Sequence, residues 1–345
     1  MRYLGGKSLL APAIYELTQQ VAPRADAVTD LFTGSGALSD YFKRRGFQVT
    51  TNDLLYFSYA ISRGSLALNK APTFDLLRLH LGEDPRHYLG ACPLPDPDAS
   101  QFLRLNYSPD STPARQYLTR DNALRIDRAR QQIEAWRTGC LLDDDEYFHL
   151  LAGVVAGVPS VSNITGTYGS YLKYWDKRAL NDFRIPELEV FDNGRDNQSY
   201  NLDAITLLGR VSGQVLYLDP PYNERQYLPN YHVLETVARY DSPAVRGVTG
   251  QRPVGSGKSD FCSRKTALAA LEDVISTAQF EHIILSYNNE GVISTNDLRD
   301  MLARYAAPGS FRLTTVPYRR YKNKIPNHAP GLAEQLYYIR KTGVA

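Results

Sequence analysis

The chain has 345 residues, of which 43% are hydrophobic and 22% charged, a composition that excludes a largely disordered protein. Lys and Arg total 39 against 37 Asp and Glu, so the net charge of +2 excludes a uniformly basic surface but allows a local basic face. The three cysteines, Cys92, Cys140 and Cys262, are far apart and form no metal-binding pattern. We therefore expect neither a disulfide framework nor a zinc site.

No segment has the length and hydrophobicity of a membrane span. The longest apolar stretch, residues 150–161, is short and is interrupted by two glycines and a proline. Residues 1–7 lack the apolar run of a signal peptide. We expect a cytoplasmic protein that does not contact a membrane.

The first 70 residues alternate helix-like and strand-like segments. Apolar spacing predicts helices over 8–21, 37–45 and 57–68, and buried strands over 28–32 and 48–52. This alternation is typical of an α/β domain with a parallel sheet.

The alternation then stops, because prolines break the next part of the chain. Helices are expected only near 121–137 and 145–156. We interpret residues 71–185 as an inserted, mostly helical lobe, which leaves one α/β domain made of residues 1–70 and 186–345.

Regular alternation resumes after the insert. The expected elements are a strand at 187–191, a helix at 202–210, strands at 214–218 and 282–287 with a helix at 268–279 between them, a helix at 296–305, and a final hairpin of strands 311–320 and 335–340. The predicted fold is a doubly wound, mostly parallel, Rossmann-like sheet of seven strands with a C-terminal antiparallel hairpin.

The sharpest motif is Asp219-Pro220-Pro221-Tyr222, which follows a buried strand. Ligands of open α/β sheets bind at the carboxyl ends of the strands, so these residues lie where chemistry is expected. The prolines supply carbonyls without competing N–H donors. Together with a carboxylate and an aromatic face, they suit a planar ring that carries an amino group. The alternative is a Pro-Pro turn in which Asp219 caps the next helix.

A glycine-containing loop joins the first strand to its helix. It reads Asp30-Leu31-Phe32-Thr33-Gly34-Ser35-Gly36, and such glycines let the backbone approach a ligand. Ser39 stands where a nicotinamide-dinucleotide fingerprint needs its third glycine, which disfavours that cofactor. Asp53 ends the next strand and suits ribose hydroxyls, with a helix N-cap as the alternative.

Other motifs point to simpler roles. Gly6-Lys7-Ser8 and Gly257-Lys258-Ser259 both lack the first glycine of a phosphate-binding loop. The acidic run Asp143–Glu146 is interpreted as a helix start rather than a metal site. Cys92 precedes a proline in a loop and is interpreted as structural.

Basic residues gather in two segments. Residues 312–341 carry seven Lys or Arg against one acid, and residues 101–140 carry seven Arg against four acids. The interleaved tyrosines are Tyr227, Tyr231, Tyr240, Tyr318 and Tyr321. Positive charge with aromatic faces suits a nucleic acid, whereas the alternative is a solvated hairpin with amphipathic tyrosines.

Taken in order, these motifs resemble the D12 class of DNA adenine-N6 methyltransferases. Arg2–Lys7 is similar to the family's N-terminal motif, Asp30–Gly36 to its S-adenosylmethionine (SAM) loop, and Asp219–Tyr222 to its catalytic tetrapeptide. The order with a recognition insert before the catalytic motif is the family's alpha arrangement. Further similarity runs through Tyr171–Lys173, Asn223–Tyr227, Ser259–Cys262, Ser286–Gly291 and Arg319–Lys322. It is weakest over 71–165.

The resemblance implies the seven-stranded SAM-methyltransferase fold, SAM as cofactor, S-adenosylhomocysteine as product, and no metal. The residues that would surround the methionine part of SAM are Tyr3, Lys7, Asp30, Phe32, Gly34 and Gly36. Asp53 would hold the ribose hydroxyls, and Asp203 would take the adenine end.

The resemblance also implies site-specific methylation of adenine N6 in double-stranded DNA, with the base flipped out. Asp219 and the Pro220 carbonyl would accept hydrogen bonds from the amino group, beside Pro221, and Tyr222 would stack on the base. Residues 71–185 would be the target-recognition lobe. The DNA contacts carried over are Lys173, Arg225, Arg319, Arg320 and Lys322.

Partners implied are double-stranded DNA and a cognate restriction endonuclease, with the chain itself a monomer. Three other functions stay open at this point. They are methylation of adenine N6 in RNA, methylation of cytosine N4 in DNA, and nucleic-acid binding by a methyltransferase-like chain that has lost catalysis. Because Asp219, Tyr222, Gly34 and Gly36 are present, we expect an active enzyme.

Overall fold

The computed structural model describes residues 6–91, 101–254, 258–317 and 333–343. Within these ranges the strands form one seven-stranded sheet in the order β3-β2-β1-β4-β5-β7-β6. The strands are β1 (Ala27–Asp30), β2 (Gln48–Asn52), β3 (Gln198–Tyr200), β4 (Ser212–Leu218), β5 (Gln279–Asn288), β6 (Arg312–Pro317) and β7 (Ala333–Arg340). Strands β1 to β5 run parallel, and β7 is antiparallel to both β5 and β6. The predicted fold class is confirmed.

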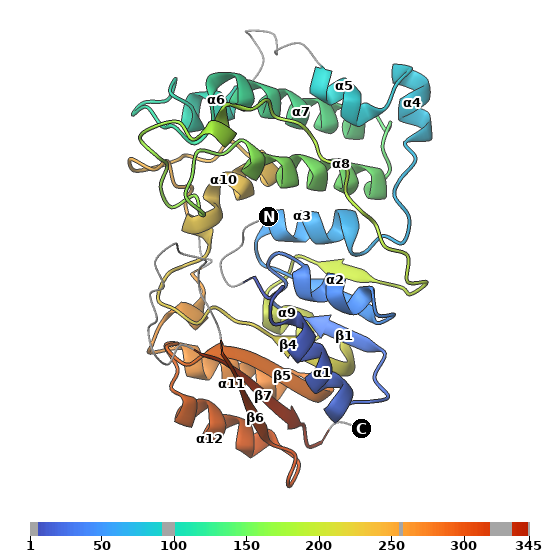
Figure 1. Cartoon of the computed structure of the whole chain (residues 1–345), viewed down its shortest axis with the longest axis vertical. Coiled ribbons are helices and arrows are strands. Elements are labelled where there is room, and N and C mark those ends of the chain that lie inside the picture. Colours follow the sequence, from blue (N-terminus) through green and yellow to red (C-terminus); the bar gives the residue numbers. More distant parts are fainter. Residues whose placement is uncertain (1–5, 92–100, 255–257, 318–332, 344–345) are drawn as a thin grey trace.

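Helices cover both faces of this sheet (Figure 1). The side chains of β4 alternate between the two helical layers. On β4, Val215 and Tyr217 pack with α1 and α2, whereas Leu216 and Leu218 pack with α9, α11 and α12. The covering helices are α1 (Ala11–Val21), α2 (Ala37–Lys43), α9 (Ala204–Leu208), α11 (Ala267–Thr277) and α12 (Thr295–Tyr305). An apolar run buried on both faces is what a central parallel strand requires.

A separate helical layer lies above the sheet domain in Figure 1 and has its own hydrophobic core. Its helices are α3 (Tyr56–Ser65), α4 (Asp75–Leu81), α5 (Pro85–Ala91), α6 (Phe102–Tyr107), α7 (Arg120–Thr138), α8 (Asp144–Gly157) and α10 (Leu228–Arg239). Phe57 of α3 and Leu234 of α10 are both buried in this core. The helical layer therefore recruits helices from outside residues 71–185.

The closest helix contact in this layer lies between α3 and α8. Gly64 has no side chain, and a Cβ placed there would lie 2.2 Å from the Phe148 carbonyl oxygen and 2.7 Å from the Ala152 Cβ. The absence of a side chain at Gly64 lets the two backbones approach each other. This contact fixes α3, which begins beside the predicted cofactor loop.

The prediction of a strand at 187–191 is wrong, because the third strand is β3 at residues 198–200. Residues 187–191 alternate polar and apolar side chains but pair with no strand among the described residues. They lie instead against α2, where Arg44 forms a 2.9 Å ion pair with Glu189 and stacks on Phe191 at 5.3 Å. Strand β3 is short, polar and half-buried at the sheet edge, so its sequence carries little strand signal.

The sequence also missed four helices. Helix α10 was not predicted because its residues 231–238 are all buried, which gives no one-sided pattern. Helices α4, α5 and α6 have six or seven residues each, and they lie in the segment interpreted as irregular. Short helices between prolines form through tertiary packing more than through their own propensity.

The acidic run is a helix start, as predicted. The Asp143 carboxylate accepts a hydrogen bond from the Glu146 N–H at 2.8 Å, and the Glu146 side chain accepts one from the Asp143 N–H at 3.1 Å. This reciprocal pair is a capping box at the N-terminus of α8. Cys92 lies outside the described residues. In the described ranges, no helix is both long and apolar enough to cross a membrane.

The close approach of α3 and α8 predicts opposite effects for one substitution at two sites. Gly64→Ala should lower the free energy of unfolding by about 1–3 kcal/mol, because the new methyl group meets the α8 backbone. Gly90→Ala in α5 meets nothing within 4 Å and should leave stability unchanged or raise it by up to about 1 kcal/mol. Urea unfolding curves measure both, and equal effects would contradict this packing.

Candidate active site

A cavity of about 590 Å³ opens at the carboxyl edge of the sheet. Its walls come from the segments that follow β1, β2, β3 and β4, which parallel strands bring to one edge. Among its lining residues six are acidic and two basic, namely Asp30, Asp53, Asp203, Asp219, Asp260 and Asp273 against Lys7 and Lys258. The cavity therefore suits a ligand that carries positive charge.

The loop after β1 is fixed by hydrogen bonds to the end of β2. Thr33 N–H donates to the Asn52 carbonyl at 2.9 Å, and Asn52 N–H donates to Thr33 Oγ1 at 3.0 Å. Gly34 and Gly36 both have positive φ, at 56° and 76°, a conformation that glycine adopts without strain. A Cβ at Gly36 would also lie 2.9 Å from the Leu66 Cδ1. The two glycines are thus required by the loop's path.

Asp53 holds this loop from the end of β2. Its Oδ2 accepts from the Gly34 N–H at 2.8 Å, and its Oδ1 accepts from the Leu55 N–H at 2.8 Å. Burial raises the pKa of Asp53 to about 6, although these two N–H donors act in the opposite direction. The alternative that Asp53 is a helix N-cap is wrong, because Leu55 is in the N-cap position of α3, and the Asp53 carboxylate lines the cavity while it holds the turn.

Asp30 lies at the base of the cavity and is fully buried. Its Oδ2 accepts from the Ser39 hydroxyl at 2.7 Å, while its Oδ1 has no hydrogen-bond partner among the described residues. Burial raises the pKa of Asp30 to about 7, against the lowering effect of Ser39, and the nearby Asp219 and Asp53 charges add to the rise. Because Asp30 Oδ1 lies at the base of the cavity without a partner among the described residues, it suits a ligand that carries a hydrogen-bond donor.

Asp219 forms a buried ion-pair cluster with residues from both ends of the chain. Lys7 Nζ lies 3.0 Å from Asp219 Oδ1 and 2.5 Å from Glu334 Oε1. Burial opposes the Lys7 charge, but the two carboxylates outweigh it and raise the pKa of Lys7 above its usual range. Burial raises the pKa of Asp219 to about 7, with Lys7 lowering it and Glu334 raising it further.

Asp219 is not a helix cap, so the alternative stated for it is wrong. The next helix, α10, begins at Leu228, with Tyr227 in the N-cap position. The segment between them is attached to the loop after β5, since Val292 N–H donates to the Tyr222 carbonyl at 2.9 Å. The Tyr222 ring is 9% exposed and packs edge-to-face with Tyr287 at 6.2 Å.

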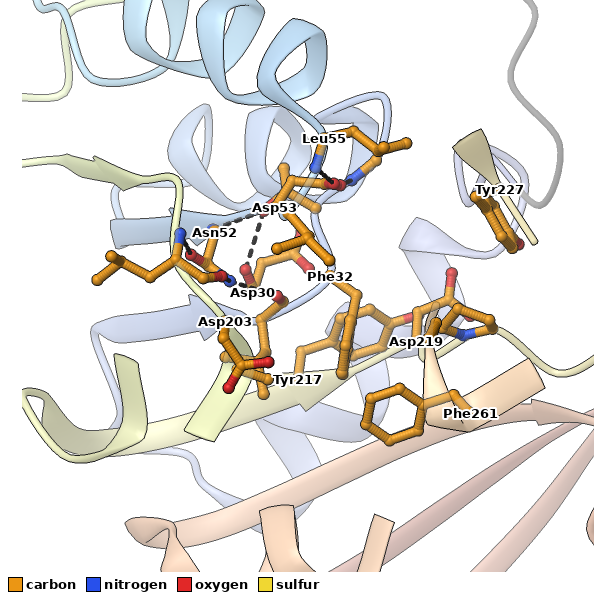
Figure 2. A pocket seen from close by; sticks show the side chains of 18 of the residues that line it. Asp30, Phe32, Asn52, Asp53, Leu55, Asp203, Tyr217, Asp219, Tyr227 and Phe261 are labelled. Carbon is orange, nitrogen blue, oxygen red and sulfur yellow. Dashed lines mark hydrogen bonds between the residues drawn. The ribbon is translucent and has the colours of Figure 1, made fainter. Parts of the chain in front are cut away.

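Aromatic side chains form the opposite end of the cavity from Asp53, as Figure 2 shows. Phe32 and Phe261 pack edge-to-face at 5.2 Å, and Tyr227 lies beyond Asp219. Asp203 is on the Asp53 side, where its carboxylate caps α9 by accepting from the Ile205 N–H at 3.0 Å. The cavity thus has an acidic end and an aromatic end.

Most of the predicted site residues meet at this cavity. Those that line it are Lys7, Asp30, Phe32, Gly34, Asp53, Asp203, Asp219 and Pro221. Gly36 lies behind the loop, at a second cavity of about 240 Å³, and Tyr222 packs beside Asp219 against Tyr287. Of the predicted DNA contacts, Lys173 and Arg225 are exposed. Tyr3, Arg319, Arg320 and Lys322 lie outside the described residues.

Two residues of the site, Glu334 and Glu235, were not singled out from the sequence, and Tyr227 was named only among the interleaved tyrosines and in the similar segment 223–227. Tyr227 lines the cavity, and Glu334 of β7 pairs with Lys7. Glu235 of α10 accepts hydrogen bonds from the Tyr56 and Phe57 N–H groups at 3.1 and 3.0 Å, so it caps α3 from another helix. Tyr227 follows the catalytic motif closely, which was a usable signal, whereas only the fold brings the two glutamates to their partners.

The cap formed by Glu235 predicts a large loss of stability on truncation. Glu235→Ala should lower the free energy of unfolding by about 2–3 kcal/mol, because two buried N–H groups of α3 and the Arg239 guanidinium lose their acceptor. The matched control is Glu187→Ala, whose carboxylate is 84% exposed, with an expected change within about 0.5 kcal/mol. Denaturant unfolding measures both, and equal small changes would show that the cap is not needed.

Comparison with known proteins agrees with this geometry. The family model of the D12 class N6 adenine-specific DNA methyltransferases matches residues 3–301. Over 99% of its length the chain is 40% identical to the Type II methyltransferase M.FokI of Planomicrobium okeanokoites, 38% to the modification methylase StsI of Streptococcus sanguinis, and 35% to the Type II methyltransferase M.NlaIII of Neisseria lactamica.

The coverage of these relatives differs. The chain spans 53% of M.FokI and 52% of StsI, about half the length of each, but 100% of M.NlaIII. The family model covers both the loop at residues 30–36 and the Asp219 motif. The chain therefore belongs to the D12 class N6 adenine-specific DNA methyltransferases.

Proposed function

We propose that this chain methylates the N6 amino group of adenine at a specific sequence of double-stranded DNA, with SAM as the methyl donor. The observation that carries the proposal is the placement of Asp219. This carboxylate follows the central strand β4, lines the cavity, and keeps an oxygen without a hydrogen-bond partner among the described residues. An amino group on a planar base is the donor that such an acceptor fits.

The cavity also fits the proposed cofactor. SAM supplies a methyl group already activated by a cationic sulfonium, which suits the excess of acidic residues on the walls. Gly34 allows the backbone to approach the ligand, and the unfilled Oδ1 of Asp30 suits an ammonium group. We assign the ribose hydroxyls to Asp53 and the adenine end to Asp203, which lie on the same side of the cavity.

In this proposal the chain's own groups position the base and orient its amino group. Asp219 and the Pro220 carbonyl accept hydrogen bonds from N6, which directs the nitrogen lone pair toward the activated methyl group. Pro221 helps to form the cavity wall, and Tyr222 beside Asp219 is assigned to stack on the base. No covalent enzyme intermediate is needed, because the methyl donor already carries its leaving group.

An adenine inside a duplex cannot reach this cavity, so the proposal requires that the base leaves the stack. We propose residues 71–185 as the target-recognition lobe, with Lys173 and Arg225 as phosphate contacts. The support is that both side chains are exposed and that the lobe is a separate helical layer beside the cavity domain. The relatives are named modification methylases and Type II methyltransferases, which supports a cognate restriction endonuclease as a partner.

Asp219→Ala tests the assignment of the catalytic acceptor. The rate of methyl transfer to unmethylated genomic DNA should fall by at least about 100-fold, because the substituted chain no longer orients the amino group. DNA affinity should stay within about threefold. The control is Asp196→Ala, which removes an exposed carboxylate bonded to Gln198 and should keep the wild-type rate.

The products of the same reactions identify the substrate. Mass spectrometry of the nucleosides should show N6-methyladenine in the DNA, and sequencing should place it at one recurring sequence. N4-methylcytosine in the DNA, or methylated RNA beside untouched DNA, would contradict the proposal. Unchanged methylation by Asp219→Ala would contradict the role of Asp219.

The raised pKa values of two carboxyl groups predict how SAM binding depends on pH. Asp53 and Asp30 have pKa values of about 6 and about 7, and each is a charged, stronger hydrogen-bond acceptor only when ionised. As pH falls from 8 to 5.5 both take up protons, so SAM affinity should decrease. Calorimetric titration of the wild type across this range measures the effect, and a pH-independent affinity would contradict it.

Asp53→Asn separates the two groups. At pH 8 this variant should bind SAM about 10-fold more weakly, the effect of replacing a charged acceptor with a neutral one. Its remaining pH dependence should follow Asp30 alone. Equal SAM affinity of Asp53→Asn and the wild type at pH 8 would remove Asp53 from the cofactor site.

A further inference from the structure

Glu334 enters the active-site cluster from a part of the chain that neither the motifs nor the cavity wall includes. It is 1% exposed and lies at the start of β7, the antiparallel strand beside β5. Its Oε1 accepts hydrogen bonds from Lys7 Nζ and from the Ser286 hydroxyl, both at 2.5 Å. A buried carboxylate held by two donors has a fixed position.

Lys7 contacts its two carboxylate partners, Glu334 and Asp219, in different ways. Lys7 Nζ donates its hydrogen bond to Glu334, whereas Asp219 receives an ion-pair contact at 3.0 Å. Asp219 Oδ1 accepts no hydrogen bond from any residue that the structure describes. Without Glu334, Asp219 would be the carboxylate left within ion-pair distance of Lys7 among the described residues, and the lysine's hydrogen bond would occupy the oxygen that the substrate needs.

We propose that Glu334 is a positioning residue for methyl transfer: by accepting the hydrogen bond of Lys7, it keeps the lysine charge 3.0 Å from Asp219 Oδ1 without a lysine hydrogen bond to that oxygen, so that Oδ1 can accept one from the amino group of the target base. This inference rests on the proposed function and extends it to a residue of β7. Ser286 supports the arrangement by holding Glu334 from β5.

Several charged or titratable groups face this cluster. Asp30 and Tyr217 lie below Asp219 on β1 and β4, Tyr222 and Tyr227 lie on the segment that follows it, and Lys7 and Glu334 come from the chain's two ends. Of these, Lys7 is the cation that lowers the pKa of Asp219, whereas Glu334 raises it. Lys7 and Glu334 therefore shift the pKa of Asp219 in opposite directions.

The test compares Glu334→Gln with Lys7→Met in single-turnover methylation at saturating SAM and DNA, from pH 5.5 to 9. Glutamine keeps a carbonyl acceptor of nearly the same size but has no charge, so it holds the Lys7 ammonium more weakly and Lys7 should turn its hydrogen bond toward the charged Asp219. The rate at pH 8 should then fall about 10- to 100-fold, the effect of losing a charged hydrogen bond in the transition state. The acid limb of the pH profile should move to lower pH.

Lys7→Met should move the acid limb the other way, to higher pH, because Asp219 loses its cation. The SAM dissociation constant of Glu334→Gln should stay within about threefold of the wild-type value, since Glu334 does not line the cavity. The control is Glu281→Gln, an exposed carboxylate on the neighbouring strand β5, with an unchanged rate and profile.

Opposite shifts of the two acid limbs support the inference, because a general loss of folding would not produce opposite signs. If the wild type is active, two results would overturn this inference and leave the proposed function intact. One is an unchanged rate and pH profile of Glu334→Gln, and the other is a shift of both variants in the same direction. Absence of methyl transfer by the wild type would overturn the proposed function and this inference with it.

Discussion

The active site depends on burying several carboxylates around a single cation. Asp30 and Glu334 are buried and the Asp219 side chain is 15% exposed, and Lys7 is the ammonium group that approaches Asp219 and Glu334. An unpaired buried charge is strongly disfavoured, so this cluster persists only if its members come from rigid elements. The sheet provides those elements, because β1, β4 and β7 deliver the three carboxylates, and Lys7 lies just before α1.

The same constraint explains why the C-terminal hairpin matters to chemistry at the other end of the chain. Strand β7 runs antiparallel to β5, so its first residues, rather than its last, reach the carboxyl edge of the sheet. This reversal places Glu334 next to Lys7, 327 residues away in sequence. The cavity keeps an excess of negative charge, which is complementary to a cationic methyl donor. Its affinity should be lower for a product that has lost the positive charge of the donor.

A second linkage connects the cofactor side of the cavity to the helical layer. Glu235 of α10 caps α3, and α3 follows the Asp53 loop directly. Because α10 itself begins after the segment that carries Asp219 and Tyr222, one helix touches both this segment and helix α3, which follows Asp53. The close contact of Gly64 with α8 ties α3 further into the helical layer.

Sequence reasoning recovered the fold class and most residues on the cavity wall, since strand ends in a parallel sheet meet at one edge and buried central strands such as β4 carry a strong apolar signal. It failed where the signal is tertiary. Strand β3 is three polar residues at a sheet edge, and α10 is buried all round. Glu334 and Glu235 look like ordinary charged residues until the fold brings a lysine and a helix N-terminus to them.

The most direct test of the central claim is a crystal structure with S-adenosylhomocysteine and a duplex that contains the target adenine identified by sequencing. The expected result is a flipped adenine whose N6 lies within hydrogen-bond distance of Asp219 Oδ1, while Lys7 still donates to Glu334. A Lys7 side chain hydrogen-bonded to Asp219, or an adenine amino group held by other residues, would contradict it.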